Sequence, residues 1–191
     1  MRTFVLFVAL GLQFNIFGQY NFSEIAHAVK AQEAEDLSAI LRESERLFSE
    51  KLNQYRKIVR AKELKHNDHI WLTALNHCLW MREHKNLSHS EKKGSKYYTG
   101  SSPSARLAFV QASLKYGAIG ENIAYTELFN EEINETHKLA ELLAKEFFDL
   151  WKKSPGHRKN MIDKSYNAHA IVILKSGNRF YAVNVFYSDT K

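Results

Sequence analysis

The chain has 191 residues and one cysteine, and its 27 Lys and Arg against 21 Asp and Glu give a formal net charge of +6. That length fits one ordinary domain with a sizeable core, and a single cysteine excludes an intramolecular disulfide. Basic and acidic residues are interleaved along the helical stretches, which predicts a mixed, solvated surface, and no basic and aromatic motif of a nucleic-acid-binding module occurs.

The amino terminus is typical of a secretory signal peptide. Arg2 supplies a positive start, residues 4–17 are almost wholly apolar, and the small residue Gly18 follows them. A membrane-spanning helix needs about 20 apolar residues, and this run is shorter and contains two polar residues. We therefore expect residues 1–18 to be removed on export, with an uncleaved anchor as the alternative. The mature chain, secreted or periplasmic, should then have no membrane span.

The first half of the mature chain is predicted to be helical. Residues 25–61 favour one or two helices, and residues 45–61 have apolar positions at helical spacing. We expect residues 19–44 to be a helical extension ahead of the domain, with a partly mobile segment over residues 19–41 as the alternative. Residues 68–84 predict another helix, apolar enough to be largely buried, with Asp68 as its N-cap. Cys78 lies in this apolar stretch and is expected to behave as a small buried hydrophobe.

The second half begins with a loop and continues with further helices. Residues 86–104 have loop composition, and Ser104 is expected to cap a short helix that ends near residue 112. A longer helix is predicted over residues 136–151. A proline after Ser154 ends that helix and favours a new short one over residues 155–161, with Ser154 as its N-cap.

The carboxyl-terminal segments predict a β-hairpin. Residues 168–174 and 179–187 are rich in Val, Ile, Tyr and Phe, and residues 175–178 between them are typical of a turn. Both strands are apolar on both faces, so helices should cover both sides of the sheet. The predicted fold class is therefore α+β.

Several short motifs, taken in order, resemble the bacterial branch of the CAP superfamily, which groups cysteine-rich secretory, antigen-five and pathogenesis-related proteins. They are Ser-His at 88–89, Gly-Glu-Asn-Ile-Ala at 120–124, Trp-Lys-Lys-Ser-Pro-Gly-His-Arg-Lys-Asn-Met at 151–161, and the aromatic closing strand. The resemblance covers residues 47–187. It implies an α-β-α sandwich, a CAP domain over residues 45–191, an extracellular location, and a shallow cleft where histidines and acidic residues converge.

Carried over position by position, the resemblance places His89, Glu121 and His157 in that cleft. Many eukaryotic members have a glutamate at a fourth position, where this chain has Ser154, and their disulfides are absent here. Metal affinity inferred from relatives with that glutamate therefore does not transfer directly to this chain.

The cleft residues also have a chemistry of their own. Two neutral imidazoles and one carboxylate, from His89, His157 and Glu121, form a set that could hold a zinc-like divalent ion with a position open for water. At the amino end of a short helix, the local positive potential should keep His157 neutral. The alternative is that the three residues only bond one another and tie their loop to the body. The remaining histidines are expected to be surface or structural residues: His27, His66, His69, His77, His84, His137 and His169.

Three functions remain open from the sequence, and none of them fixes a cofactor or an oligomeric state. The first is an exported module that binds lipid, sterol or envelope glycan, which the resemblance favours. The second is a metal-assisted hydrolase of peptide or glycan, and the third is a structural or interaction protein without a ligand. A nucleophilic set of Ser154, His157 and Glu121 ranks below these, because the serine is expected to cap a helix and no oxyanion site is evident.

Overall fold

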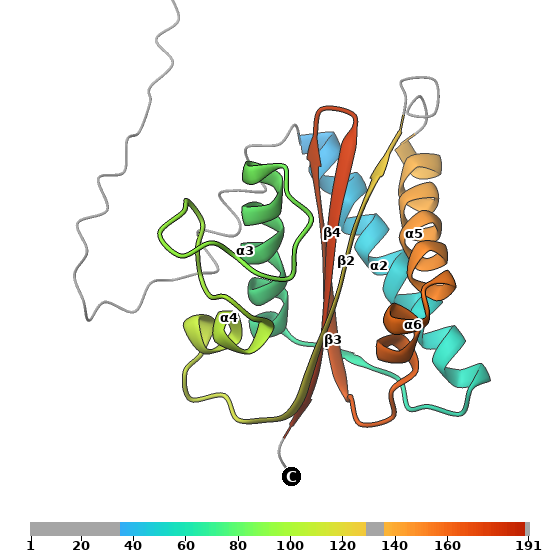
Figure 1. Ribbon diagram of the computed structural model, residues 1–191. Helices are drawn as coiled ribbons and strands as arrows, with labels where there is room; N and C mark the ends of the chain where they lie inside the picture. Colours follow the sequence, from blue (N-terminus) through green and yellow to red (C-terminus); the bar gives the residue numbers. More distant parts are fainter. Residues whose placement is uncertain (1–34, 129–135, 190–191) are drawn as a thin grey trace, which may run out of the picture.

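The computed structural model describes residues 35–128 and 136–189. The predicted signal peptide, residues 1–18, and the start of the predicted extension lie outside the described residues. Three layers are visible in Figure 1: a sheet in the middle, α3 and α4 on one side, and α2, α5 and α6 on the other. The elements are α2 Glu35–Ile58, β1 Lys65–His66, α3 Asp68–His84, α4 Pro103–Val110, β2 Tyr116–Glu127, α5 Thr136–Lys153, α6 Pro155–Ile162, β3 Ala168–Ser176 and β4 Arg179–Asp189.

The sheet has the strand order β1-β3-β4-β2. The predicted hairpin is confirmed, since β3 and β4 pair antiparallel from Ala168 opposite Tyr187 to Ser176 opposite Arg179. Strand β2 pairs antiparallel with the other side of β4, and the short β1 pairs parallel with β3. Helices on both faces of this mixed sheet confirm the predicted α+β class and the α-β-α sandwich.

Each face of the sheet is covered by a separate hydrophobic core. Because side chains alternate along a strand, β4 supplies Phe180, Ala182 and Phe186 to one core and Tyr181, Val183 and Val185 to the other. The first core is closed by α2 and α5, where the Phe48 ring meets the Trp151 ring edge to face with centroids 5.2 Å apart. The second core is closed by α3, whose Cys78 is fully buried as expected.

Helix α2 is one continuous helix over Glu35–Ile58, within the stretch where one or two helices were predicted. It begins at Glu35, so the predicted boundary between an extension and a domain at residue 45 falls inside one continuous helix. Leu41 is fully buried in the core shared with α5, and Ser44 is buried beside it. Residues 35–44 therefore belong to the domain, because they continue the apolar face of α2 towards the amino terminus.

Helix starts differ by one or two residues from the sequence prediction. The N-cap of α3 is Asn67 and not Asp68, since the Asn67 side chain accepts the amide hydrogen of Ile70 at 3.1 Å. The cap of α4 is likewise Ser102, which accepts from Ala105, and not Ser104. Both corrections move the cap to the residue whose backbone is extended, as an N-cap requires.

Strand β2 was not predicted, although it carries part of the expected site. Glycines and polar residues at 117–122 hide the strand pattern, and pairing with β4 over residues 116–127 overrides that local preference. Gly120 is required here by a close approach, because a Cβ at this position would lie 2.4 Å from the Tyr166 hydroxyl oxygen. A side chain at residue 120 would therefore push Tyr166 away from the sheet.

Arg56 joins the end of α2 to the turn that follows it and to the end of α6. Its guanidinium is fully buried and donates to the carbonyl oxygens of Lys62 at 2.7 Å, Met161 at 2.8 Å and Asp163 at 2.9 Å. Burial lowers the pKa of Arg56 from its ordinary value, and Asp163 opposes that shift. The contacts fix the carboxyl end of α6 against the turn that follows α2.

His169 should make the fold sensitive to acid. Its imidazole is buried on β3, bonded at 3.0 Å to the Asn184 side chain, and burial lowers its pKa to about 4. In the unfolded chain this ring takes up a proton below about pH 6.5, whereas in the folded chain it does not until about pH 4. The contribution of His169 to the free energy of unfolding should therefore be fully present above pH 6.5. The free energy of unfolding should then fall by about 3 kcal/mol as the pH drops towards 4.

Urea unfolding between pH 7.5 and 4 measures this loss. In a His169→Gln variant the fall over that range should be smaller by about the same amount, because glutamine does not titrate. His84→Gln, at an exposed position in the last turn of α3, is the matched control and should leave the pH dependence close to that of wild type. Equal pH dependence in wild type and His169→Gln would contradict this assignment.

Candidate functional site

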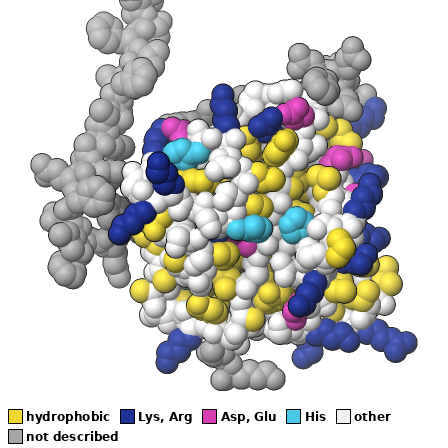
Figure 2. Space-filling model, in the orientation of Figure 1, with side chains coloured by type: hydrophobic (Ala, Val, Ile, Leu, Met, Phe, Trp, Pro, Cys, Tyr) yellow, Lys and Arg dark blue, Asp and Glu magenta, His cyan; other side chains and the backbone are white. Residues whose placement is uncertain are grey.

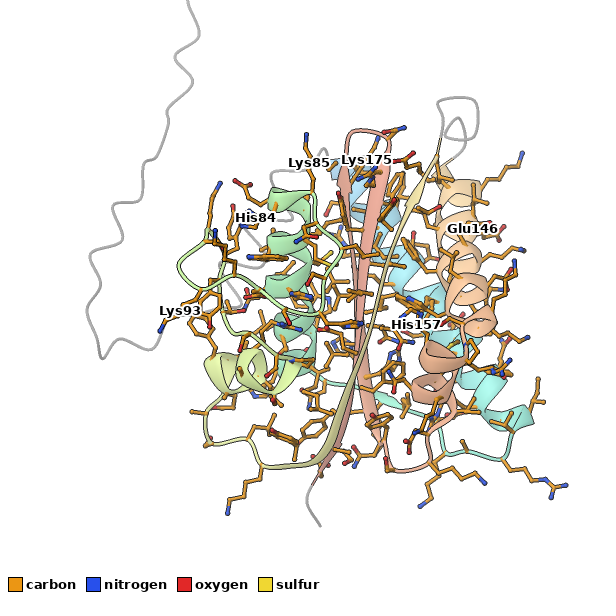
Figure 3. All side chains as sticks on the ribbon, viewed as in Figure 1. His84, Lys85, Lys93, Glu146, His157 and Lys175 are labelled. Carbon is orange, nitrogen blue, oxygen red and sulfur yellow. The ribbon has the colours of Figure 1, made fainter. Side chains whose placement is uncertain are left out.

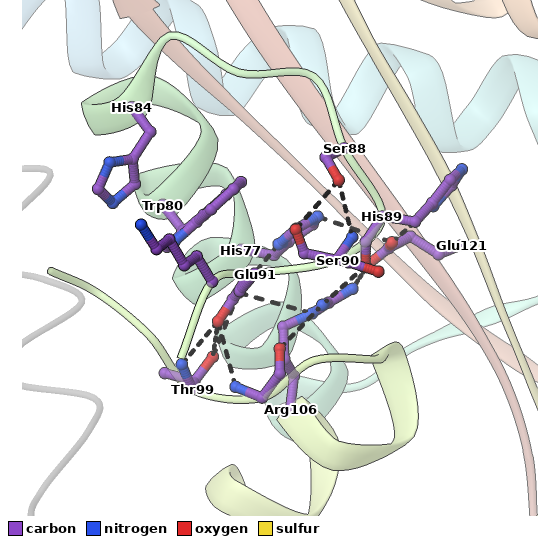
Figure 4. Close-up of polar contacts among 12 residues, drawn as sticks. His77, Trp80, His84, Ser88, His89, Ser90, Glu91, Thr99, Arg106 and Glu121 are labelled. Carbon is purple, nitrogen blue, oxygen red and sulfur yellow. Dashed lines mark hydrogen bonds and ion pairs between the residues drawn. The ribbon is translucent and has the colours of Figure 1, made fainter. Parts of the chain in front are cut away.

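The candidate site is centred on a pair between His89 and Glu121. His89 lies in the loop between α3 and α4, and Glu121 lies on the edge strand β2. The Nδ1 atom of His89 is 2.9 Å from Oε1 of Glu121 (Figure 4). The His89 side chain is 54% exposed whereas that of Glu121 is 1% exposed, so a buried carboxylate holds a solvent-facing imidazole.

Arg106 forms the other half of the Glu121 environment. Its Nη2 donates to Oε2 of Glu121 at 2.5 Å, and both side chains are buried. Its Nη1 donates to the carbonyl oxygens of His89 at 3.1 Å and of Gly100 at 3.3 Å. One arginine from α4 therefore holds both the carboxylate of the site and the loop that carries His89.

A second buried carboxylate, Glu91, completes this ion network. His77 of α3 places its Nδ1 2.9 Å from Oε1 of Glu91, and its Nε2 3.7 Å from Oε1 of Glu121. The other oxygen of Glu91 accepts the amide hydrogens of Thr99 at 2.6 Å and Gly100 at 3.1 Å. We call His77, Glu91, Arg106 and Glu121 the buried ion network; all four side chains are at most 1% exposed.

Glu121 is ionised in this environment. Burial by itself would raise its pKa, but the hydrogen bond with His89 and the charges of His77 and Arg106 outweigh burial and lower the pKa below 4.5. An ionised carboxylate only accepts hydrogen bonds, so Nδ1 of His89 carries a hydrogen and Nε2 faces away from Glu121. Glu121 thus sets both the tautomer and the direction of the His89 ring.

His157 reaches the site from the other side of β2. It is the third residue of α6, as predicted, and its carbonyl oxygen accepts from the Asn122 side chain at 3.0 Å. Burial first, and then the proximity of His89, lower the pKa of His157 below 6.5, so the ring is neutral at pH 7. Figure 3 labels it on α6, and Figure 2 shows two histidine side chains close together in the middle of the same face. The predicted neutral state is supported, with burial rather than the helix end as its main cause.

Ser154 is placed as predicted but does not act as predicted. It is the N-cap residue of α6, with Pro155 at the first helical position. Its side chain makes no capping hydrogen bond, so only the backbone acts there, with the Ser154 carbonyl accepting from Arg158 at 2.8 Å. Because a hydroxyl replaces a carboxylate at this position, Ser154 brings no negative charge to the site.

The predicted metal set of His89, Glu121 and His157 is not formed. Over residues 35–128 and 136–189, no group of three His, Cys, Asp or Glu side chains is arranged to hold a metal ion. The physical reason is that Glu121 is already bonded through both oxygens, to His89 and to the Arg106 guanidinium. A cation would have to compete with the arginine beside that carboxylate. Glu121 is therefore not free to act as a third metal ligand beside His89 and His157.

Two residues of the buried ion network, Glu91 and Arg106, were not found by the sequence analysis. His77 was expected to be a surface or structural residue, and its buried pairing with Glu91 makes it structural. Two signals could have found them: His77 lies on the apolar face of a buried helix, and Glu91 follows His89 by two residues in a loop. A buried charge needs a partner, so His77 should have prompted a search for a carboxylate.

The fold is similar to two solved structures of bacterial proteins. One is an outer surface protein from Borrelia burgdorferi, with a TM-score of 0.61 and 16% identity over 78% of this chain and 94% of that chain. The other is an extracellular protein containing a SCP domain from Bacillus anthracis, with a TM-score of 0.56 and 20% identity over 76% of this chain and 40% of that chain. At these identities the likeness shows the α-β-α fold alone. No curated protein matches the sequence.

The family itself is shown by a sequence match. The model of the cysteine-rich secretory protein family, CAP, matches residues 50–188. The chain therefore belongs to the CAP family, and the resemblance of its motifs is confirmed. None of the helices in the described part of the chain is long and apolar enough to cross a membrane.

Zinc titration tests whether His89, Glu121 and His157 bind a metal ion. Calorimetry on wild type should give no tight binding, and His89→Ala and His157→Ala should not differ from it, because Arg106 occupies the carboxylate that zinc would need. Tight zinc binding that is lost in both variants would show that the carboxylate can exchange the arginine for a metal.

The electrostatic contact between the two histidines can be measured by NMR titration. The ring of His157 should titrate below pH 6.5, and in a His89→Gln variant its midpoint should rise but stay below 6.5, since burial remains. His66→Gln on the far strand β1 serves as the control and should leave the midpoint unchanged. No rise in His89→Gln would mean that the two rings do not interact.

Proposed function

We propose that this CAP protein is an exported binding module whose His89 and His157 hold a hydroxyl-rich ligand, an envelope glycan. The observation that carries the proposal is the aimed His89 ring, held by a buried carboxylate beside a second, neutral imidazole. Export is supported by the apolar amino-terminal segment and by the extracellular SCP-domain protein of the same fold.

The two rings offer the hydrogen-bonding groups that sugars use. A neutral imidazole has one N–H donor and one nitrogen acceptor, which match the donor and acceptor capacity of a hydroxyl. In His89 the Glu121 carboxylate takes Nδ1, so Nε2 is the nitrogen turned towards a ligand. His157 adds a second ring with a lowered pKa, and so both an acceptor and a donor at pH 7.

The His89 loop is held in place before any ligand binds. Arg106 bonds two of its carbonyl oxygens, and Glu91 accepts two of its amide hydrogens. Trp80 of α3 donates from its indole nitrogen to the Ser95 hydroxyl at 2.8 Å. A loop tied at this many points loses little conformational entropy on binding, which favours affinity.

A glycan fits this site better than a lipid or a sterol. Ligand sites for apolar molecules are lined mainly by hydrophobic and aromatic side chains. Here His89 is flanked in the chain by Ser88 and Ser90 and lies above the charged Glu121 and Arg106. The polar character of these neighbours supports a ligand bound by hydrogen bonds.

Calorimetric titration with soluble peptidoglycan fragments tests the proposal. Wild type should bind them saturably, and His89→Ala and His157→Ala should each weaken binding about tenfold, the effect of losing about one hydrogen bond. His66→Ala on β1, at the opposite edge of the sheet, is the matched control and should bind as wild type does.

Three other outcomes would contradict the proposal. Unchanged affinity in both site variants would show that His89 and His157 do not bind the ligand. Binding of a sterol or fatty-acid probe instead of the glycan, lost in His89→Ala, would assign a lipid ligand. A lower melting temperature in His89→Ala, in a protein that binds none of these probes, would support a purely structural role.

A hydrolase is the second candidate, and the pairing of Glu121 with His89 favours it. A carboxylate that orients an imidazole is what a general base needs to take a proton from water. The fragments recovered from the titration, analysed by chromatography, distinguish the two functions. Intact fragments indicate a binding module, whereas cleavage that is lost in His89→Ala indicates a hydrolase.

A further inference from the structure

Two short segments carry more positive charge than the whole chain. Residues 56–65 contain five Lys and Arg and one acid, Glu63, and residues 152–164 contain five more and one acid, Asp163. Together they hold a formal charge of +8, whereas the chain as a whole has +6, so all other residues sum to −2. The net positive charge of the chain is therefore concentrated in these two segments.

The fold brings these two segments together at one corner. The Lys152 ammonium lies 4.9 Å over the Tyr55 ring, which joins the ends of α5 and α2. The buried Arg56 bonds Lys62 on one segment and both Met161 and Asp163 on the other. In Figure 2, Lys and Arg side chains gather along the margin on the α5 and α6 side and at the corner below it. We call the exposed members outside strand β1 the basic corner: Lys57, Arg60, Lys62, Lys152, Lys153, Arg158, Lys159 and Lys164.

Helix stability does not account for the whole corner. Bases in the last turn of a helix interact favourably with its dipole, which accounts for Lys57 on α2, Lys152 and Lys153 on α5, and Lys159 on α6. Lys62 and Lys164 lie outside the helices, in the segments that follow α2 and α6. The two acids within the segments, Glu63 and Asp163, offset only two of the ten positive charges. The corner thus keeps a positive potential that suits an anionic partner.

An exposed apolar side chain indicates which kind of anionic partner fits. Ile58, next to Lys57 at the end of α2, is 78% exposed, the highest value among the large hydrophobic residues of the described chain. A soluble polyanion gives such a side chain no apolar contact, whereas the headgroup and acyl boundary of a bilayer does. Cations around a protruding apolar residue are the combination that binds anionic membrane surfaces.

We propose that the basic corner docks on the surface of an anionic phospholipid membrane, with Ile58 entering the interface. The corner lies at the ends of α2 and α5 and includes residues of α6 next to His157. Neither ring of the proposed glycan site belongs to the corner, so this inference does not depend on that site. Docking would hold the exported domain against the membrane without a spanning helix, by electrostatic attraction that weakens as salt is added.

Cosedimentation of the processed chain, recovered after export, with lipid vesicles tests this docking. Wild type should bind vesicles that contain about one third phosphatidylglycerol and not vesicles of phosphatidylcholine alone. Lys57→Gln/Lys153→Gln/Lys159→Gln should weaken binding about a hundredfold, through the loss of three cations. Ile58→Ser should weaken it several-fold with no change in charge.

The matched control removes the same charge from the opposite side of the molecule. It is Lys92→Gln/Lys93→Gln/Lys115→Gln, on exposed lysines of the α3 and α4 side, where Figure 3 labels Lys93. Melting curves confirm that every variant is folded, and near-wild-type binding by the control supports the basic corner. Equal losses in both triple variants would show that net charge alone acts and overturn the proposal. No wild-type binding to anionic vesicles, or wild-type binding by Ile58→Ser, would also overturn it.

Discussion

The buried ion pair between Arg106 and Glu121 is the contact on which the site depends. It joins α4 to the edge strand β2, and the same guanidinium holds the backbone of His89. Taking charges out of water costs several kcal/mol per ion, and removing one partner of such a pair typically destabilises a protein by about 3–5 kcal/mol. Each charge of the pair therefore needs a hydrogen-bonding or charged partner for its polar atoms. Glu121 has them in Arg106 and His89, whose bonds offset its burial. The exposed imidazole is thus one of the partners that offset the burial of this carboxylate.

Strand β2 explains why the two histidines can meet although they belong to different layers. Successive residues of a strand point to opposite faces, so Glu121 turns towards the α3 side and Asn122 towards the α6 side. Glu121 holds the ring of His89, while Asn122 holds the backbone of His157. Gly120 before them leaves the space that the Tyr166 hydroxyl occupies. Each residue of the Gly-Glu-Asn motif therefore has a separate role. The glycine leaves space for Tyr166, the glutamate places an anion on one face of the strand, and the asparagine places an amide on the other.

Much of the fold followed from the sequence, because long periodic segments are decided by burial. The helices 68–84 and 136–151 and the closing hairpin were predicted to within a few residues, and His89, Glu121 and His157 were named together. What was missed depends on tertiary contact. Strand β2 forms because β4 offers it an edge, and the roles of His77, Glu91 and Arg106 arise only when loop and helix come together. The basic corner was missed for the same reason, since its two halves are about a hundred residues apart along the chain.

The only thiol of the chain is sealed inside the core. Cys78 is fully buried on α3, and its Sγ lies 3.4 Å from the carbonyl oxygen of Tyr181. Folding is therefore independent of oxidation, and the protein can be produced in a reducing compartment without a disulfide to form. A cysteine introduced at the surface would react with a maleimide dye or spin label while Cys78 stays protected. The native domain is in this respect already a labelling scaffold, on which distances between chosen surface points can be measured without first removing a residue from its core.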